Sequence, residues 1–166
     1  MKKLGRVMVC VLLLATVGRA QAQWGPSTEL TQGWSLRAGF FVPEREAPRA
    51  SEGDIWLTFG AERAFYEFEQ WVGTVSIDYY GSGRVYNVPI MVNLRGENNR
   101  LRYGAGVGVG ISHDLQEGIL GLAYNFLIGY TLVEGRHPIT ADIRYLGQTT
   151  GRGELNGWGF TLGTTF

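Results

Sequence analysis

Apolar and polar residues alternate along most of the chain after residue 32, with the two-residue period of a β-strand. The pattern is clearest over 100–111, where arginines and glycines share one face, while Leu101, Tyr103 and Val107 share the other. The same alternation predicts eight strands, at 33–42, 54–63, 70–80, 84–95, 100–111, 118–132, 139–146 and 157–166. The sequence therefore predicts an all-β protein made of eight antiparallel strands.

The two faces of these strands have the polarity of a membrane barrel. In a water-soluble barrel of eight strands, bulky apolar side chains would fill the interior. Here one face of every predicted strand is small, polar or charged, and such a face cannot form an apolar core. A tilted membrane-spanning strand needs about 9–11 residues, which matches the predicted lengths. We therefore expect a transmembrane β-barrel with the apolar face in lipid.

Several charged residues fall on the face that would line the barrel interior. A charge facing lipid near the bilayer centre would cost about 2–4 kcal/mol, so these side chains are expected to point inward. The predicted network of interior charges consists of Arg37, Glu62, Asp78, Arg95, Arg100, Arg102, Asp142 and Arg144.

Two interpretations of this network are open. Eight strands leave an interior only just wide enough for side chains, which favours a plug of arginine–carboxylate pairs. A narrow arginine-lined pore is the alternative. For the plug, Glu62 and Asp142 are each expected to contact at least one of Arg37, Arg95 and Arg102, because an unpaired buried charge is costly.

Aromatic residues gather near the strand ends, as expected where amphipathic rings meet lipid headgroups. One predicted girdle contains Trp34, Trp71, Tyr103, Tyr130 and Phe166. The other contains Phe40, Trp56, Tyr79, Tyr86, Tyr145 and Trp158.

The first 22 residues have the pattern of a secretory signal peptide. A basic start is followed by an apolar run of about 11 residues, too short for a membrane helix, and then by Ala20-Gln21-Ala22. Cleavage would leave a short periplasmic segment, 23–32, before the barrel domain, 33–166. It would also remove the only cysteine and shift the formal net charge from zero to −4, a balance that offers no nucleic-acid-binding surface.

The other candidate motifs do not meet the requirements of a phosphate-binding loop, a catalytic triad or a metal site. The glycine run 104–110 lacks the third glycine, helix and lysine of a phosphate-binding loop. Ser112, His113 and Asp114 have the residue types of a catalytic triad, but neighbours on an extended strand point to opposite sides. His137 is expected in a turn at the other end of the barrel, so the two histidines cannot share a metal ion.

Three segments, 86–95, 103–110 and 157–166, resemble the small outer-membrane β-barrel family (OmpA/OmpX/OmpW-like proteins). The resemblance covers nearly all of 33–166 and implies architecture more than activity, since the fold hosts several functions. It implies that the last strand is read by the outer-membrane assembly machinery, with periplasmic chaperones as further partners during biogenesis. The residues of this C-terminal assembly signal would be Trp158, Phe160, Leu162 and Phe166.

The sequence thus predicts a monomeric outer-membrane barrel that contacts lipid and lipopolysaccharide, without enzymatic activity, cofactor or metal. Its expected role is structural, in envelope integrity or surface interactions. A narrow pore for small solutes is the alternative, and a lipid A-modifying enzyme using His113 is a third reading. The connections at 43–53, 81–83, 112–117 and 148–154 are expected outside the cell, and those at 64–69, 96–99 and 133–137 in the periplasm.

Overall fold

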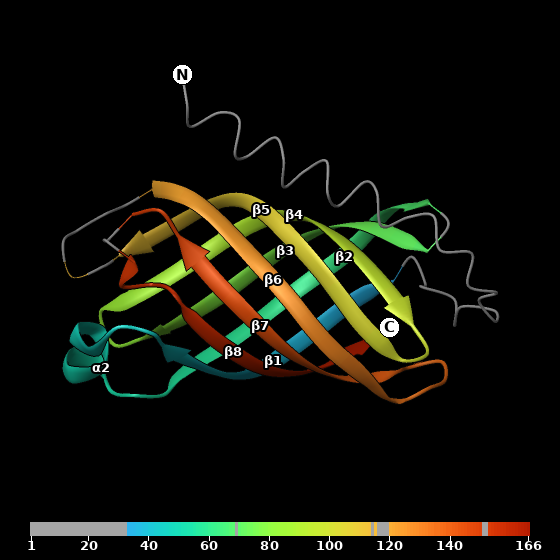
Figure 1. Ribbon diagram of the computed structural model, residues 1–166, viewed down its shortest axis with the longest axis horizontal. Helices are drawn as coiled ribbons and strands as arrows, with labels where there is room; N and C mark the ends of the chain where they lie inside the picture. Colours follow the sequence, from blue (N-terminus) through green and yellow to red (C-terminus); the bar gives the residue numbers. More distant parts are fainter. Residues whose placement is uncertain (1–32, 69, 114, 116–119, 151–152) are drawn as a thin grey trace, which may run out of the picture.

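The computed structural model of the protein describes residues 33–166 except 69, 114, 116–119 and 151–152, so the predicted signal peptide and the segment 23–32 lie outside the described residues. The described chain forms a closed antiparallel barrel of eight strands (Figure 1). The elements are β1 (Trp34–Pro43), α2 (Glu46–Glu52), β2 (Trp56–Phe68), β3 (Trp71–Ser82), β4 (Val85–Asn98), β5 (Leu101–His113), β6 (Leu120–Val133), β7 (Ile139–Gln148) and β8 (Gly157–Thr165).

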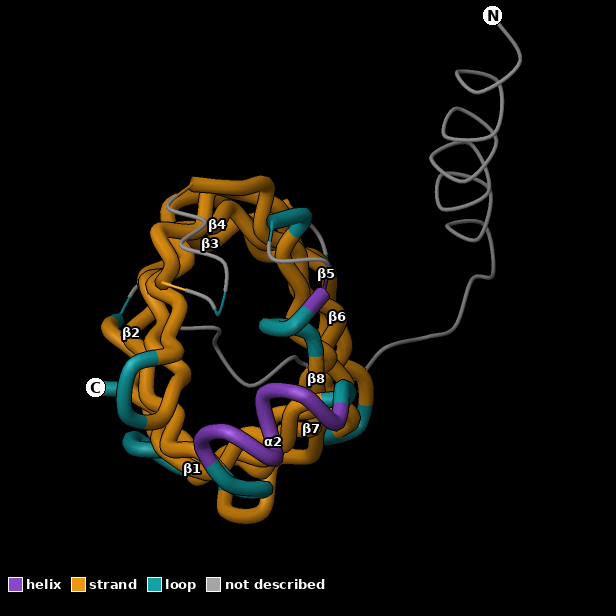
Figure 2. Tube along the Cα trace, turned by 90° about the vertical axis from the view of Figure 1, so that its left-hand side faces the viewer, coloured by secondary structure: helices purple, strands orange, loops and turns teal. Residues whose placement is uncertain are grey.

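Each strand pairs with the next along the chain, and β8 returns to pair with β1. Ser35 lies opposite Thr165 in this closing pair, and the register continues to Pro43 opposite Gly157. Seen along the barrel, the strands form a ring with α2 at one rim (Figure 2). We call this rim the helix end and the opposite rim, where β1 begins and β8 finishes, the terminal end.

Alternation along the strands divides the side chains between the interior and the outer surface. Along β1, Leu36 and Phe40 are exposed while Arg37 and Phe41 are buried. Every strand carries exposed apolar side chains on its outer face, among them Phe40, Leu57, Val75, Val92, Val107, Leu122, Ile143 and Leu162. The predicted division into a polar face and an apolar face is therefore present around the whole ring.

Three of the predicted turns, 64–69, 81–83 and 96–99, are mostly strand in the structure, and at 81–83 this is because β3 continues to Ser82. The segment 64–69 was expected to be a turn, but β2 continues to Phe68, with a register shift between Ala64 and Tyr66. This bulge leaves Phe65 and Tyr66 both exposed, which hides the alternation in the sequence. The turn expected at 96–99 is also displaced, because β4 continues to Asn98. Asn99 and Arg100, both with positive φ, form the turn itself, as in a tight two-residue hairpin.

The long connection after β1 contains the short helix α2, which the strand pattern did not predict. Its residues include the helix formers Ala47 and Arg49, and Pro48 lies within the first turn, where a missing N–H costs little. Two contacts hold α2 at the rim: Trp56 Nε1 donates to the Gly53 carbonyl at 2.8 Å, and Ser82 Oγ donates to the Glu52 carbonyl at 3.0 Å.

Candidate functional site

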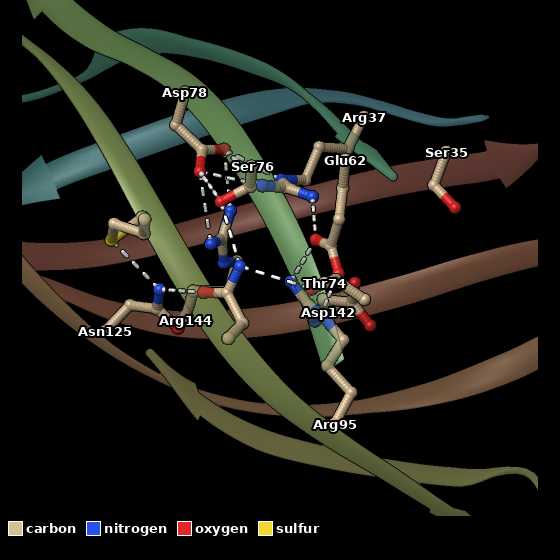
Figure 3. Close-up of polar contacts among 12 residues, drawn as sticks. Ser35, Arg37, Glu62, Thr74, Ser76, Asp78, Arg95, Asn125, Asp142 and Arg144 are labelled. Atoms are coloured by element: carbon tan, nitrogen blue, oxygen red, sulfur yellow. Dashed lines mark hydrogen bonds and ion pairs between the residues drawn. The ribbon is translucent and has the colours of Figure 1, made fainter. Parts of the chain in front are cut away.

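The middle of the barrel interior contains a chain of alternating charges that we call the ion chain. It runs in the order Arg95, Glu62, Arg37, Asp78 and Arg144, and it joins five strands, β4, β2, β1, β3 and β7 (Figure 3). All five side chains are largely buried. The ion chain therefore crosses the interior and ties together strands that are far apart in the sequence.

Arg37 occupies the centre of the ion chain. Its Nη1 donates to Glu62 Oε2 at 2.6 Å, while Nε and Nη2 donate to the two Asp78 oxygens at 2.8 and 2.7 Å. Arg144 Nη1 reaches Asp78 from the other side at 2.9 Å, and Arg95 donates to Glu62. The fork of Arg37 thus bridges both carboxylates, a two-pronged geometry that lysine could not supply.

Hydroxyl and amide groups complete the hydrogen bonding of these carboxylates. Thr74 Oγ1 donates to Glu62 Oε1 at 2.7 Å, and Ser76 Oγ donates to Asp78 Oδ2 at 3.3 Å. Asn93 Nδ2 in turn donates to Ser76 Oγ at 3.0 Å, and Asn125 donates to Asn93 at 2.8 Å. The buried charges therefore belong to a connected polar network, which offsets the cost of removing them from water.

Glycines on neighbouring strands make room for the acidic side chains. Gly60 lies opposite Asp78, and a Cβ at Gly60 would collide with the Asp78 carboxylate. Gly129 stands in the same relation to Asp142. The absence of a side chain at these positions lets each carboxylate lie across the adjacent strand.

Asp142 forms a second ion pair nearer the terminal end. Arg102 Nη1 donates to Asp142 Oδ1 at 2.6 Å and to Oδ2 at 2.8 Å. The Arg102 side chain is 18% exposed, so this pair is wetter than the ion chain. Glu62 and Asp142 therefore make the arginine contacts predicted from the sequence.

Arg100 is the member of the predicted network that lies elsewhere. It is in the turn before β5, where its guanidinium donates to both Glu134 oxygens, at 2.7 and 2.9 Å, on the outside of the terminal end. This hydrogen-bonded partner raises the pKa of Arg100 above its ordinary value. The alternation predicted a strand that starts at residue 100, but β5 begins at Leu101. Arg100 has a positive φ, so it does not continue the alternation of the strand.

A compact apolar cluster, which we call the apolar plug, fills the interior at the helix end. It consists of Phe41, Trp56, Tyr80, Val85, Leu146 and Leu155. The ring centroids of Phe41 lie 4.5 Å from Tyr80 and 5.6 Å from Trp56. The prediction of Trp56 in an outer aromatic girdle is wrong, because its side chain faces inward and is buried.

The sequence contains a signal for the apolar plug in two pairs of neighbouring aromatic residues. Phe40-Phe41 and Tyr79-Tyr80 are pairs of consecutive aromatic residues in strands. Because successive side chains of a strand point to opposite faces, one ring of each pair must enter the interior. Phe41 and Tyr80 are these inward members, and Phe40 remains exposed.

Little open space remains inside the barrel at the terminal end. The hollow there measures about 80 Å³ and is lined by residues that include Arg95, Arg102 and Thr131. A volume of this size accommodates roughly a few water molecules. At the other end, the side chains of the apolar plug are almost fully buried.

The Ser112–His113 pair is divided between the two faces of β5. Ser112 is buried and accepts a hydrogen bond from Gln148 Nε2 at 2.7 Å, whereas His113 stacks on Tyr86 outside, with centroids 6.2 Å apart. Asp114 lies outside the described residues. His137 is at the opposite end, where Nδ1 is 3.2 Å from the Thr165 carbonyl. Among the residues that the structure describes, no three of the metal-ligating types are grouped.

A comparison of the chain with protein-family models, curated proteins and solved structures finds no match. Within the described part of the chain, no helix has the length and apolar character to cross a membrane.

Proposed function

We propose that this protein is a closed, non-conducting barrel of the bacterial outer membrane with a structural role in the envelope. The observation that carries the proposal is its polarity: the outer surface is ringed by apolar side chains, while the interior contains the ion chain. In water, so large an apolar surface would be a liability for aggregation. In a bilayer the same surface is matched to lipid, and the closed ring leaves no strand edge unpaired.

Two layers of side chains in the interior favour a closed barrel rather than a pore. The ion chain fills the middle, and the apolar plug seals the helix end with side chains that are almost fully buried. A solute would have to break several charge-assisted hydrogen bonds and then displace packed aromatic rings. A structural or surface-contact role therefore fits the interior better than passive transport.

The proposed location and orientation combine the barrel with the sequence predictions. Export would use residues 1–22, and Phe166, exposed at the terminal end, would serve in recognition by the assembly machinery. The terminal end has short turns such as Asn99–Arg100, whereas the helix end carries α2 and the longer connection between β7 and β8, together with one short turn at Gly83–Arg84. Short periplasmic turns and longer outer connections are usual in such barrels, so the helix end is proposed to face outward.

Reconstitution into planar bilayers tests the proposal. The purified protein should insert and give no conductance steps, and Asp78→Asn alone should conduct weakly at most because the apolar plug remains. The combination of Asp78→Asn with Trp56→Ala should open measurable conductance. Asp78→Asn with Trp158→Ala is the matched control, since Trp158 is exposed on the outer face. Large conductance in the unchanged protein would refute a closed barrel.

A further inference from the structure

The outer face of the described strands carries a single arginine and no acidic residue. This arginine is Arg63 of β2, which is exposed and pairs with two exposed outward residues, Trp34 of β1 and Val75 of β3. The other arginines and acidic residues of the described strands lie on the interior side of the alternation. Arg63 is thus placed to contact the surroundings of the barrel and not its interior.

Arg63 lies at the terminal end, because it is opposite Trp34, the first residue of β1. An arginine that faces lipid is most costly at the bilayer centre and costs little near the headgroups. Trp34 is a member of the aromatic girdle predicted for this rim, where rings meet the headgroups. In the proposed orientation this rim lies in the periplasmic leaflet, which is the phospholipid leaflet of an outer membrane.

The guanidinium of Arg63 is supported by a ring and not by an acid. Its Cζ lies 5.6 Å from the centroid of the Trp34 ring, which is a cation–π distance. Among the described residues it has no ion pair or hydrogen bond. The ring covers one face of the planar group, so the N–H donors along its edge stay available to a ligand.

The bulge of β2 lies beside a hollow next to this guanidinium. Phe65 and Tyr66 are both exposed at the bulge, and Phe65 lies over Gly73 of β3, where a Cβ would be 3.2 Å from the Phe65 ring. The hollow measures about 640 Å³, and its lining includes Arg63, Phe65, Tyr66 and Val75. Its size is within the range of roughly 300–1,000 Å³ that is usual for small-molecule sites.

The acidic residue at this hollow does not neutralise Arg63. Glu67 also lines the hollow, but it pairs with Val72, whose side chain is buried, so Glu67 has the parity of the interior face. Within the described structure Glu67 forms no ion pair with Arg63. The hollow therefore presents one uncompensated positive charge beside apolar and aromatic side chains.

We infer that this hollow binds an anionic phospholipid of the periplasmic leaflet, with Arg63 donating paired hydrogen bonds to the phosphate oxygens. The planar fork of arginine suits phosphate in this two-pronged manner. Phe65, Tyr66 and Val75 would contact the glycerol and the upper part of the acyl chains. A headgroup with net negative charge is favoured over a zwitterionic one, because Arg63 is uncompensated. The inference rests on the proposed membrane location and orientation, and it adds a specific ligand to them.

The test titrates the full-length mature barrel, purified in a neutral detergent, with dilauroyl phosphatidylglycerol or dilauroyl phosphatidylcholine, and counts bound lipid by native mass spectrometry. One phosphatidylglycerol should bind more tightly than phosphatidylcholine. Arg63→Gln should weaken binding of phosphatidylglycerol about tenfold, the usual scale for a lost charge-assisted hydrogen bond, and should remove the preference. Arg136→Gln is the matched control, since it removes the same charge from an exposed turn at the same end.

Two further variants separate the geometry of the guanidinium from its charge. Arg63→Lys keeps the charge but not the planar fork, so it should bind phosphatidylglycerol more weakly than the unchanged protein. Trp34→Leu removes the ring that supports the guanidinium and should also weaken binding. Trp158→Leu is its control, because Trp158 is a similarly exposed ring at the helix end. Unchanged binding by Arg63→Lys would overturn the two-pronged contact.

Competition with glycerol 3-phosphate decides whether a lipid or a free phosphate is the occupant. An excess of this soluble phosphate should not displace phosphatidylglycerol, since it has no acyl chains to contact the outer face, and displacement would overturn the lipid as the ligand. Equal binding of the two lipids, or an equal loss in Arg63→Gln and Arg136→Gln, would overturn the site. Failure of the proposed function would instead appear as a conducting barrel, or as a protein that does not float with vesicles, whatever the titration gives.

Discussion

The buried carboxylates of the interior differ in how many arginines they contact. Among the described residues, Asp78 and Glu62 each contact two arginines, whereas Asp142 contacts Arg102 alone. Removing one partner from a buried ion pair leaves the other charge uncompensated, and this loss commonly costs about 3–5 kcal/mol. Loss of Glu62 or Asp78 should therefore destabilise the barrel more than loss of the more exposed Arg102–Asp142 pair, which lies outside the ion chain.

This difference predicts an order of stabilities. Asp78→Asn should lower the free energy of unfolding by about 3 kcal/mol or more, because Arg37 and Arg144 both lose their anion. Asp142→Asn should also destabilise the barrel, by a smaller amount. The measurement is the temperature at which the compact, faster-migrating form is lost on unboiled gels. Equal losses in the two variants would refute the predicted order, and if neither differs from the unchanged protein, then water and not pairing stabilises the interior charges.

A second prediction at this scale concerns Gly60. Alanine at this position would push its methyl group into the Asp78 carboxylate, and overpacking of this kind typically costs about 1–3 kcal/mol. Gly159→Ala is the matched control, since its Cβ would meet nothing closer than Leu146 Cδ1 at 3.5 Å. Urea unfolding of both variants in the same detergent gives the comparison. Equal stabilities would mean that Asp78 moves aside without loss.

At the scale of elements, β8 both closes the ring and leads to the aromatic residue Phe166, which we propose that the assembly machinery recognises. Its last contacts continue beyond the strand, because the Phe166 amide donates to the Trp34 carbonyl at 2.9 Å. The Phe166 ring itself is exposed and lies beside His137, with centroids 5.6 Å apart. The backbone of residue 166 thus belongs to the closed barrel, whereas its ring is free for recognition.

These separate roles give a prediction for assembly. Phe166→Ala keeps the backbone hydrogen bond and removes the ring, so we expect lower amounts in the outer membrane with an unchanged melting temperature for the fraction that folds. Deletion of Phe166 should reduce the amounts at least as much. Phe126→Ala is the control, since Phe126 is an exposed ring in the middle of β6 and lies outside the predicted assembly signal. Normal accumulation of Phe166→Ala would leave the ring as an ordinary surface residue.

The whole molecule is polarised along the barrel axis. The helix end is filled by the apolar plug and carries α2, whereas the terminal end has the small interior hollow lined by Arg95 and Arg102. This asymmetry underlies the proposed orientation, in which α2 faces the outside of the cell.

Epitope insertion tests the orientation of the whole barrel. A tag after Ala50 in α2 should be labelled by antibody on intact cells, and a tag between Asn99 and Arg100 should be labelled only after the outer membrane is permeabilised. Both sites lie outside the strands, so insertion should preserve the barrel. Surface labelling of the tag at Asn99 would reverse the proposed orientation.

Local alternation was enough to predict the eight strands and the division between interior and outer surface. Successive side chains of a strand point to opposite faces, so Arg37 and Leu36 are assigned to opposite sides without knowledge of any partner strand. Apart from Trp56, which has the parity of the inward residues Thr58 and Glu62, the positions where this reasoning failed are those where the period breaks. They are the bulge between Ala64 and Tyr66, the positive φ of Arg100, and the helix α2.

Only the tertiary structure decided which interior groups meet. Asp78 and Arg144 are 66 residues apart, and their contact depends on the closure and register of the ring, which bring β3 and β7 into reach across the interior. The same closure gathers Phe41, Trp56 and Leu155 into the apolar plug. A two-residue period shows on which side of a strand a residue lies. It does not show at which position along the barrel axis that side chain meets one from a distant strand, because the strand register sets this position.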